Sequence, residues 1–270
     1  MNDELGERMK GNYEHRTRFF VPRRTHTIIR LDGKAFHTYT RGLKKPFDLD
    51  LYNDMDNAII AMLPHIQGAV FAYTQSDEIS VLVTDFALPT TSAWFDGNIQ
   101  KMASVSSSII TAEFNRLRLV RNVYGADLSG IKNVIQLTSP AYFDSRVFTI
   151  PDRTEVMNYF IWRNQDCARN AVSMVAQSKF SHKELQGKST AMMQEMLMTE
   201  FKINWSEYDE ALKNGRLIVK EEYLSASATE DKPVLPEHES AAVRTRWVSK
   251  PAWKFTQDKE KLMEMIPRYE

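Results

Sequence analysis

The first half of the chain alternates short apolar runs of β-branched residues with longer segments of helical spacing. Apolar and β-branched residues fill positions 25–31 and end at Asp32-Gly33, which predicts a β-strand followed by a turn. Apolar residues recur every three to four positions over 51–63, just before Pro64, and this spacing predicts a helix. By the same criteria we predict strands over 69–73 and 79–83, a helix over 99–114 and a strand over 141–150.

The order of these elements predicts how they form a sheet. Strand, helix, hairpin, helix and strand make the βαββαβ order of a ferredoxin-like fold, the plan on which the palms of nucleotide polymerases are built. The predicted fold class is therefore α+β. In this plan Asp32 lies at the end of the first, central strand, and residues 74–77 form the tight connection of the neighbouring hairpin. We therefore expect Asp77, at the hairpin tip, to lie near Asp32.

The second half of the chain has the pattern of a helical region. Periodic apolar positions after the last predicted strand indicate one long helix, followed by shorter helices over 190–201 and 206–214. Residues 225–240 mix Ser, Ala, Thr, Pro and acidic residues, which predicts a mobile loop. We accordingly divide the chain into a palm-like catalytic domain, 1–150, and a mainly helical C-terminal domain, 151–270.

Charge and composition narrow the class of protein. The formal net charge of the 270 residues is zero, but residues 1–45 contain eleven Lys or Arg against five Asp or Glu, and residues 221–240 contain six acids against one Lys. The basic segment is compatible with binding phosphates or RNA, and an ordinary solvated surface explains it as well. Cys167 is the single cysteine, so an intrachain disulfide is excluded. No apolar run is long enough for a signal peptide or a membrane span, and we expect a cytoplasmic protein without a membrane partner.

Asp32 and Asp77 are the candidate metal ligands. Mg²⁺ takes few protein ligands and bridges to substrate phosphates, so two carboxylates suffice for an ion that carries a nucleoside triphosphate. Two such ions about 4 Å apart can activate an attacking oxygen and stabilise the leaving one. Gly33 lacks a Cβ, so the backbone there can approach a metal or phosphate closely. Each motif alone is also compatible with a plain turn or a solvated hairpin, but their joint placement in a palm-like order favours the metal site.

Further polar residues are candidates for phosphate and RNA contacts. A lysine ammonium is a compact charge suited to phosphate oxygens, although each candidate lysine is also compatible with ordinary exposed surface. The candidates for a triphosphate contact are Lys34, Lys45 and Lys101. Ser76 and His37 are candidates for contacts with a phosphate or base; the alternatives are that Ser76 only caps the turn and that His37 is an interior histidine. The candidates for RNA contacts are Arg163, Arg169 and Asn170, and the alternative is surface pairing with Asp166.

Several short segments, specific in combination, match one known family. They are Arg30-Leu31-Asp32-Gly33-Lys34-Ala35-Phe36-His37, Lys45-Pro46-Phe47-Asp48, Ser76-Asp77-Glu78, Phe143-Asp144-Ser145-Arg146-Val147, Trp162-Arg163-Asn164-Gln165-Asp166-Cys167, Leu185-Gln186-Gly187 and Phe201-Lys202-Ile203-Asn204. Together they resemble the histidine-tRNA guanylyltransferase family, whose members add nucleotides in the 3′-to-5′ direction. The resemblance covers roughly residues 8–224.

The resemblance implies a metal site, a nucleotide site and an assembly. It implies two Mg²⁺ ions held by Asp32, the Gly33 backbone and Asp77, with ATP, GTP or another nucleoside triphosphate as substrate. The catalytic residues it implies are Asp32, Asp77, Glu78 and Lys45. The nucleotide-binding residues it implies are Arg30, Gly33, Lys34, Ala35, Phe36, His37, Asp48, Ser76 and Lys101. It also implies tRNA as the partner and a homotetramer built as a dimer of dimers.

One segment separates this chain from the eukaryotic members of the family. They carry His-Ile-Asn-Asn-Leu-Tyr-Asn, where this chain reads Ala168-Arg169-Asn170-Ala171-Val172-Ser173-Met174 and retains only Asn170 in register. The chain thus resembles the bacterial and archaeal branch, which implies template-dependent 3′-to-5′ addition to the 5′ end of tRNA through an adenylylated or guanylylated end. The alternatives are non-templated addition of G to histidine tRNA, a palm-fold nucleotidyl cyclase that needs no RNA, and an RNA-binding protein without catalysis.

Overall fold

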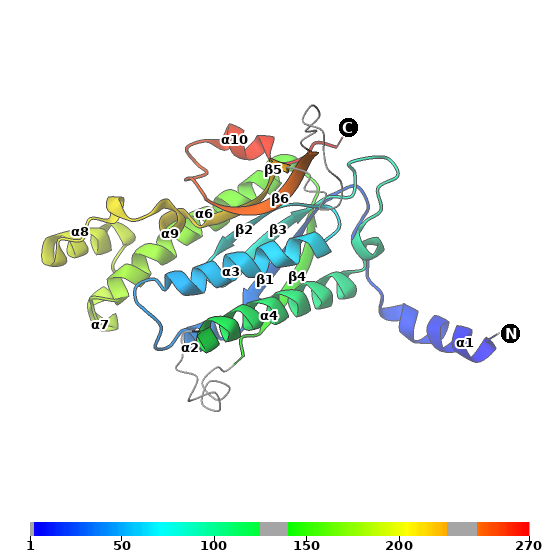
Figure 1. Cartoon of the computed structure of the whole chain (residues 1–270), viewed down its shortest axis with the longest axis horizontal. Helices are drawn as coiled ribbons and strands as arrows, with labels where there is room; N and C mark the ends of the chain where they lie inside the picture. Colours follow the sequence, from blue (N-terminus) through cyan, green and yellow to red (C-terminus); the bar gives the residue numbers. More distant parts are fainter. Residues whose placement is uncertain (1–2, 125–139, 226–241, 270) are drawn as a thin grey trace, which may run out of the picture.

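A six-stranded antiparallel sheet forms the centre of the computed structural model, which describes residues 3–124, 140–225 and 242–269. Its strands lie in the order β4-β1-β3-β2-β5-β6 (Figure 1). The first four keep the order 4-1-3-2 and alternate with helices as βαββαβ, which confirms the ferredoxin-like palm. The strands are β1 (His26–Gly33), β2 (Ala69–Gln75), β3 (Glu78–Val83), β4 (Phe143–Ile150), β5 (Arg216–Ser225) and β6 (Ala242–Pro251).

Helices cover both faces of the sheet, and one helix stands apart. Helix α1 has no buried residue and projects away from the body (Figure 1). No helix in the described ranges is both long and apolar enough to cross a membrane. The α-helices are α1 (Glu4–Asn12), α2 (Phe36–Tyr39), α3 (Leu49–Met62), α4 (Ile99–Tyr124), α6 (Arg153–Gln177), α7 (His182–Leu185), α8 (Thr190–Phe201), α9 (Glu210–Asn214) and α10 (Lys259–Glu264), with short 3₁₀ helices at Glu14–Thr17, Leu63–His65, Trp94–Gly97 and Trp205–Glu207.

Strand alternation divides the core into two layers. Ile29 and Leu31 of β1 pack into the layer that contains apolar residues of α3 and α4, and Ile28 packs into the opposite layer with α6 and α10. Successive side chains of a strand point to opposite faces, so one run of apolar residues in β1 serves both layers. A third, smaller cluster joins α6 to α7 and α8. The functional residues of β1 therefore sit at the end of a strand that is buried on both faces.

The C-terminal half differs from the sequence prediction in one respect. Helix α9 ends at Asn214, and the chain then forms β5 and β6 before the short helix α10, with β5 pairing with β2 through Ile218 and Ala72. The run Leu217-Ile218-Val219 is a strand signal, but its pairing partner lies far away in the chain, so the helical pattern before it dominated the prediction. The sheet continues across the predicted domain division at residue 150, and that division stays a prediction.

Element ends also differ by a few residues. Helix α4 continues to Tyr124, well beyond the predicted end at residue 114. Helix α9 begins at Glu210 because Asp209 caps it, accepting a hydrogen bond from the backbone N–H of Ala211 at 2.7 Å. Apart from Ser225, the loop predicted over 225–240 lies outside the described residues.

A buried carboxylate fastens α3 to α4. Asp54 is 2 % exposed and accepts hydrogen bonds from Arg118 at 3.0 Å and from Arg121 at distances down to 2.6 Å. Burying a charge is costly unless its partners hydrogen-bond it fully, and here two guanidinium groups do so. The pair fixes the register of the two helices that carry one layer of the palm core.

Replacement of Asp54 should therefore destabilise the fold strongly. We expect Asp54→Asn to lower the free energy of unfolding by about 3 kcal/mol, because it leaves two arginines facing a neutral amide in a buried site. Asp50 offers a matched control, since it also pairs with Arg121, at 3.0 Å, but is 49 % exposed. Asp50→Asn should cost less than about 1 kcal/mol. Urea unfolding measures both variants, and equal losses would contradict the assignment.

Candidate nucleotide and metal site

Two segments far apart in the sequence meet at one end of the sheet. β1 ends at Gly33 and β3 begins at Glu78, and Asp32 lies directly opposite Glu78 in the antiparallel register. The hairpin between β2 and β3 turns at Ser76, whose φ of 48° lies in the left-handed region. This places Asp77 at the hairpin tip, as the sequence predicted, next to the strand that carries Asp32.

The backbone at Gly33 abuts the side chain of Asp77. A Cβ added at Gly33 would lie 2.9 Å from the Cβ of Asp77 and 2.3 Å from Cδ2 of Phe36, so a side chain at this position would displace its neighbours. Glycine is therefore required for the close approach of the two segments. The contact brings the Asp32-Gly33 turn and the hairpin tip together.

A cavity of about 680 Å³ opens at this point. Its volume lies within the range of small-molecule sites, roughly 300–1,000 Å³. Residues of β1, of the α2–α3 segment, of the hairpin tip and of the end of α6 line the cavity. The candidate residues that line it are Asp32, Gly33, Ala35, Phe36, His37, Lys45, Asp48, Ser76 and Asp77.

The donor set at the cavity fits magnesium. Asp32 and Asp77 supply carboxylate oxygens, and Gly33, which directly follows Asp32, lines the same cavity with its backbone carbonyl as a further oxygen donor. Across the three described ranges, no group of three or more His, Cys, Asp or Glu side chains is arranged to hold a metal. Magnesium is commonly bound by only one or two carboxylates together with substrate phosphates. A magnesium ion held by these groups would complete its coordination with substrate phosphates.

Asp77 is in an environment that disfavours its charge. Burial raises the pKa of Asp77 to about 6, and the nearby charges of Asp32 and Glu78 add to this rise, while hydrogen bonds from Ser76 and the backbone oppose it. Two carboxylates that repel each other at one site are stabilised by a cation bound between them.

The carboxylate of Asp48 binds backbone N–H groups of the segment that lines the cavity. Both carboxylate oxygens are engaged, one accepting from the N–H of Leu51 at 2.9 Å as the cap of α3 and the other from the N–H of Lys44 at 3.2 Å. The Asp48 side chain thus stabilises the backbone of the loop that places Lys45 in the cavity wall. Its predicted contact with a nucleotide stays a prediction.

Three of the remaining candidates lie away from the cavity lining. Lys34 is exposed, and Lys101 is exposed on α4 with its ammonium 5.7 Å from the ring centre of Phe95. Arg30 is directed to Glu78, which accepts from its Nη2 at 2.8 Å. The nucleotide contacts expected of these residues stay predictions.

The buried position of Arg163 corrects the expectation that it faces RNA. It is 4 % exposed, and its Nε and Nη2 donate to the two carboxylate oxygens of Glu78 at 2.6 Å each. A guanidinium buried against a carboxylate has no surface to offer an RNA strand. Glu78, expected to be catalytic, is itself 8 % exposed and occupied by this pair.

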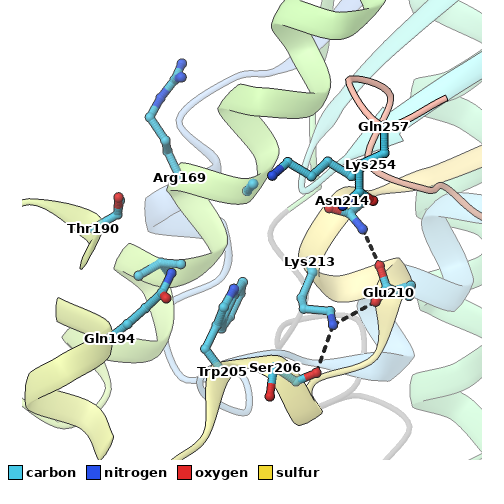
Figure 2. A pocket seen from close by; sticks show the side chains of 12 residues that line it. Arg169, Thr190, Gln194, Trp205, Ser206, Glu210, Lys213, Asn214, Lys254 and Gln257 are labelled. Carbon is cyan, nitrogen blue, oxygen red and sulfur yellow. Dashed lines mark hydrogen bonds and ion pairs between the residues drawn. The ribbon is translucent and has the colours of Figure 1, made fainter. Parts of the chain in front are cut away.

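Asn170 and Arg169 face two different cavities. Asn170 lines a small space of about 20 Å³ beside Ser76. Arg169 lines a second pocket of about 340 Å³ between α6, α8, α9 and the segment after β6 (Figure 2). Trp205 and Lys254 line the same pocket, in which Lys213 is already bonded to Glu210. We refer to it below as the α6–α9 pocket.

Sequence reasoning missed several charged residues at the site. Arg41 and Lys44 line the large cavity beside Lys45, and the basic excess of residues 1–45 was the signal that could have found them. Arg146 lies on β4 with its Nη2 3.9 Å from Asp32. It could be placed only after the pairing of β1 with β4 was known, because the two residues are remote in sequence.

Comparison with known proteins identifies the family. A family model described as tRNAHis guanylyltransferase matches residues 6–151, more than half of the chain. The chain belongs to the tRNAHis guanylyltransferase family. It is therefore a nucleotidyltransferase, and the family expected from the sequence motifs is confirmed.

Individual relatives agree with this membership. The chain is 30% identical over 236 residues to uncharacterized protein R259 of Acanthamoeba polyphaga mimivirus, covering 82% of this chain and 78% of that protein. A bacterial tRNA(His) guanylyltransferase-like protein solved in complex with ATP is 37% identical with a TM-score of 0.79, covering 98% of this chain and 99% of that one. A bacterial protein of the same description, solved in complex with GTP, is 35% identical with a TM-score of 0.75. The match covers 97% of this chain and 99% of that one.

The raised pKa of Asp77 predicts a pH-dependent effect on stability. The pKa of about 6 exceeds the ordinary value of 3.8, so the folded protein binds this proton more tightly than the unfolded chain. Ionised Asp77 therefore opposes folding above pH 6, and the opposition fades as the pH falls toward 4.

Without divalent cations, we expect Asp77→Asn to raise the free energy of unfolding at pH 7.5 by roughly 1–2 kcal/mol after allowance for solvent screening. The gain should shrink as the pH is lowered toward 4. Denaturant unfolding at several pH values measures it. A variant less stable than the parent at pH 7.5 would contradict the electrostatic account of the site.

Proposed function

We propose that this protein adds nucleotides in the 3′-to-5′ direction to the 5′ end of a tRNA, with the added base chosen by pairing to the opposite strand. The observation that carries the proposal is the convergence of Asp32, Gly33 and Asp77 on one cavity large enough for a nucleotide. Family membership and the ATP and GTP complexes of the bacterial relatives support it.

The first proposed step activates the RNA end. An oxygen of the RNA 5′-monophosphate attacks the α-phosphate of ATP or GTP; a new P–O bond forms, and the bond to pyrophosphate breaks. Phosphoryl transfers of this kind are accelerated chiefly by positioning and by neutralising charge. Magnesium held by Asp32, Asp77 and the Gly33 carbonyl would supply much of that neutralisation.

The chain's own cations would supply the rest of the neutralisation. Arg41, Lys44 and Lys45 line the cavity from one loop, and the carboxylate of Asp48 fixes the backbone of that loop. Charges fixed before the reaction need no reorganisation when negative charge builds up on the leaving pyrophosphate. Positioning of the triphosphate is the role we assign to this loop.

The second proposed step joins the new nucleotide. The 3′-hydroxyl of an incoming nucleoside triphosphate attacks the activated 5′ phosphate and releases its proton to solvent. A new P–O bond forms, and the phosphoanhydride bond to AMP or GMP breaks. No side-chain nucleophile is required, so the carboxylates and cations at the cavity suffice for both steps. Selection of the base by the template suits a chain in which residues 168–174 depart from the eukaryotic motif.

The α6–α9 pocket is our candidate for an RNA contact. Arg169 and Lys254 offer cationic groups for phosphate, and Trp205 offers an aromatic surface on which a base can stack (Figure 2). Gln194 and Gln257 add groups that can donate and accept hydrogen bonds. This pocket takes over the role first expected of Arg163, which is buried.

The assembly and the cellular compartment remain expectations of the same proposal. A homotetramer follows from the family resemblance, and cytoplasmic localisation follows from the substrate proposed. Size-exclusion chromatography with light scattering tests the first, and fractionation of cells tests the second.

The decisive experiment is a gel assay on a 5′-truncated tRNA, with one nucleoside triphosphate supplied at a time and magnesium present. We expect the RNA to grow only with the nucleotide that matches the template strand. G addition opposite any residue would favour the non-templated reaction instead. Products from GTP alone, without RNA, would favour a cyclase.

Asp32→Ala in the same assay tests the metal site. We expect both steps to slow by about 10³-fold or more, because a carboxylate lost from such a site removes several kcal/mol of transition-state stabilisation. Circular dichroism and thermal unfolding control for the fold. Full activity in the folded variant would refute the assignment of the site.

Charge reversal in the α6–α9 pocket should weaken RNA binding without changing the chemistry. We expect Lys254→Glu to raise the Kd for tRNA roughly tenfold, and its dependence on salt to become shallower, because a phosphate contact is lost. Lys259 is a nearby exposed lysine outside the pocket, and Lys259→Glu is the matched control. Filter binding at several salt concentrations compares them, and equal effects would remove the pocket from the RNA site.

A further inference from the structure

The carboxylate of Glu78 is the centre of a buried charge cluster behind the metal site. It accepts two hydrogen bonds from Arg163 of α6 at 2.6 Å and one from Arg30 of β1 at 2.8 Å. Its backbone carbonyl accepts from the hydroxyl of Thr74 at 3.0 Å. The residue next to Asp77 is thus tied to the opposite arm of its own hairpin, to the strand that carries Asp32 and to the long helix behind the sheet.

The cluster continues toward the molecular surface along α6. Asp166 accepts from Nη2 of Arg163 at 2.8 Å with one oxygen and from Nη2 of Arg169 at 2.9 Å with the other. The Arg163 guanidinium also lies 4.2 Å from the ring centre of Trp162. A continuous chain of ion pairs therefore runs from the α6–α9 pocket, through Arg163, to the residue beside Asp77.

This arrangement leaves Glu78 little capacity to bind a metal. Both of its oxygens are engaged by guanidinium groups, and bidentate pairs of this kind are the strongest and most directional that side chains form. Arginine is suited to the position because its planar fork matches a carboxylate. The two arginines also offset a third negative charge that would otherwise stand beside Asp32 and Asp77.

We propose that Glu78, Arg163 and Asp166 are positioning residues, which fix the hairpin tip so that the Asp77 carboxylate faces Asp32 at the metal site. This inference rests on the proposed metal-dependent function. The Glu78 carboxylate accepts three hydrogen bonds and so cannot swing freely. The hairpin tip, which directly precedes Glu78 in the chain, is restrained with it. The orientation of Asp77 is then set before the metal and the nucleotide bind.

The test measures cation binding directly, with Mn²⁺ as the probe and electron paramagnetic resonance of free Mn²⁺ as the readout. Mn²⁺ suits the same oxygen ligands as Mg²⁺. We expect Arg163→Lys to raise the Kd for Mn²⁺ about tenfold, as is usual when a group that orients a ligand is replaced. Glu78→Gln should raise it similarly. Hydrogen exchange of the backbone amides over 74–79 should become faster in both variants.

A matched control separates this effect from the loss of any buried ion pair. Arg118 pairs with Asp54 at 3.0 Å in a site that is just as buried, between α3 and α4. Arg118→Lys should lower the thermal stability and leave the Kd for Mn²⁺ within about twofold of the parent. A comparable loss of Mn²⁺ affinity in Arg118→Lys would reduce the effect to general destabilisation and overturn the inference.

Asp77→Asn distinguishes failure of the inference from failure of the metal site. If Asp77→Asn leaves Mn²⁺ binding unchanged, the proposed metal site is wrong and the positioning role falls with it. If Asp77→Asn abolishes binding and Arg163→Lys does not weaken it, the metal site stands and the positioning role is overturned. Tighter binding in Arg163→Lys would indicate that Glu78, once freed, is itself a ligand.

Discussion

The antiparallel pairing of β1 with β3 is the constraint on which the site depends. It sets Asp32 opposite Glu78, so the last residues of β1 and the first residues of the hairpin come to the same end of the sheet. A shift of one residue in this register would turn Asp32 toward the opposite layer, because side chains alternate along a strand. The apolar residues of β1, buried on both faces, hold the register, and the position of the polar residues follows from it.

Buried ion pairs link the sheet and the helices around this site. Asp54 joins α3 to α4, Asp56 of α3 accepts from Arg216 of β5 at 2.7 Å, and Glu78 joins the hairpin to Arg163 of α6. Each pair connects segments that are distant in sequence and would be costly to break on one side only. Apolar packing provides most of the cohesion, while these pairs specify how the layers are placed against one another.

The site itself works against stability. Burial and neighbouring carboxylates raise the pKa of Asp77, so its ionised form is unfavourable until a cation binds. A protein that binds magnesium and nucleotide at such a point recovers this free energy on binding, because repulsion is replaced by coordination. The cationic residues Arg41, Lys44 and Lys45 line the same cavity, and in the proposed function their charges complement the triphosphate.

The sequence alone determined the four strands of the palm, the helices α3, α6 and α8, and the two aspartates at strand ends, because each rests on local periodicity or turn chemistry. It also carried the motifs that indicate the family. The pairing of β5 with β2, the burial of Arg163 against Glu78, and the place of Arg146 beside Asp32 were decided only by the tertiary structure. In each case the partner lies far along the chain, and no local pattern in a sequence encodes which distant side chain will fill a buried position.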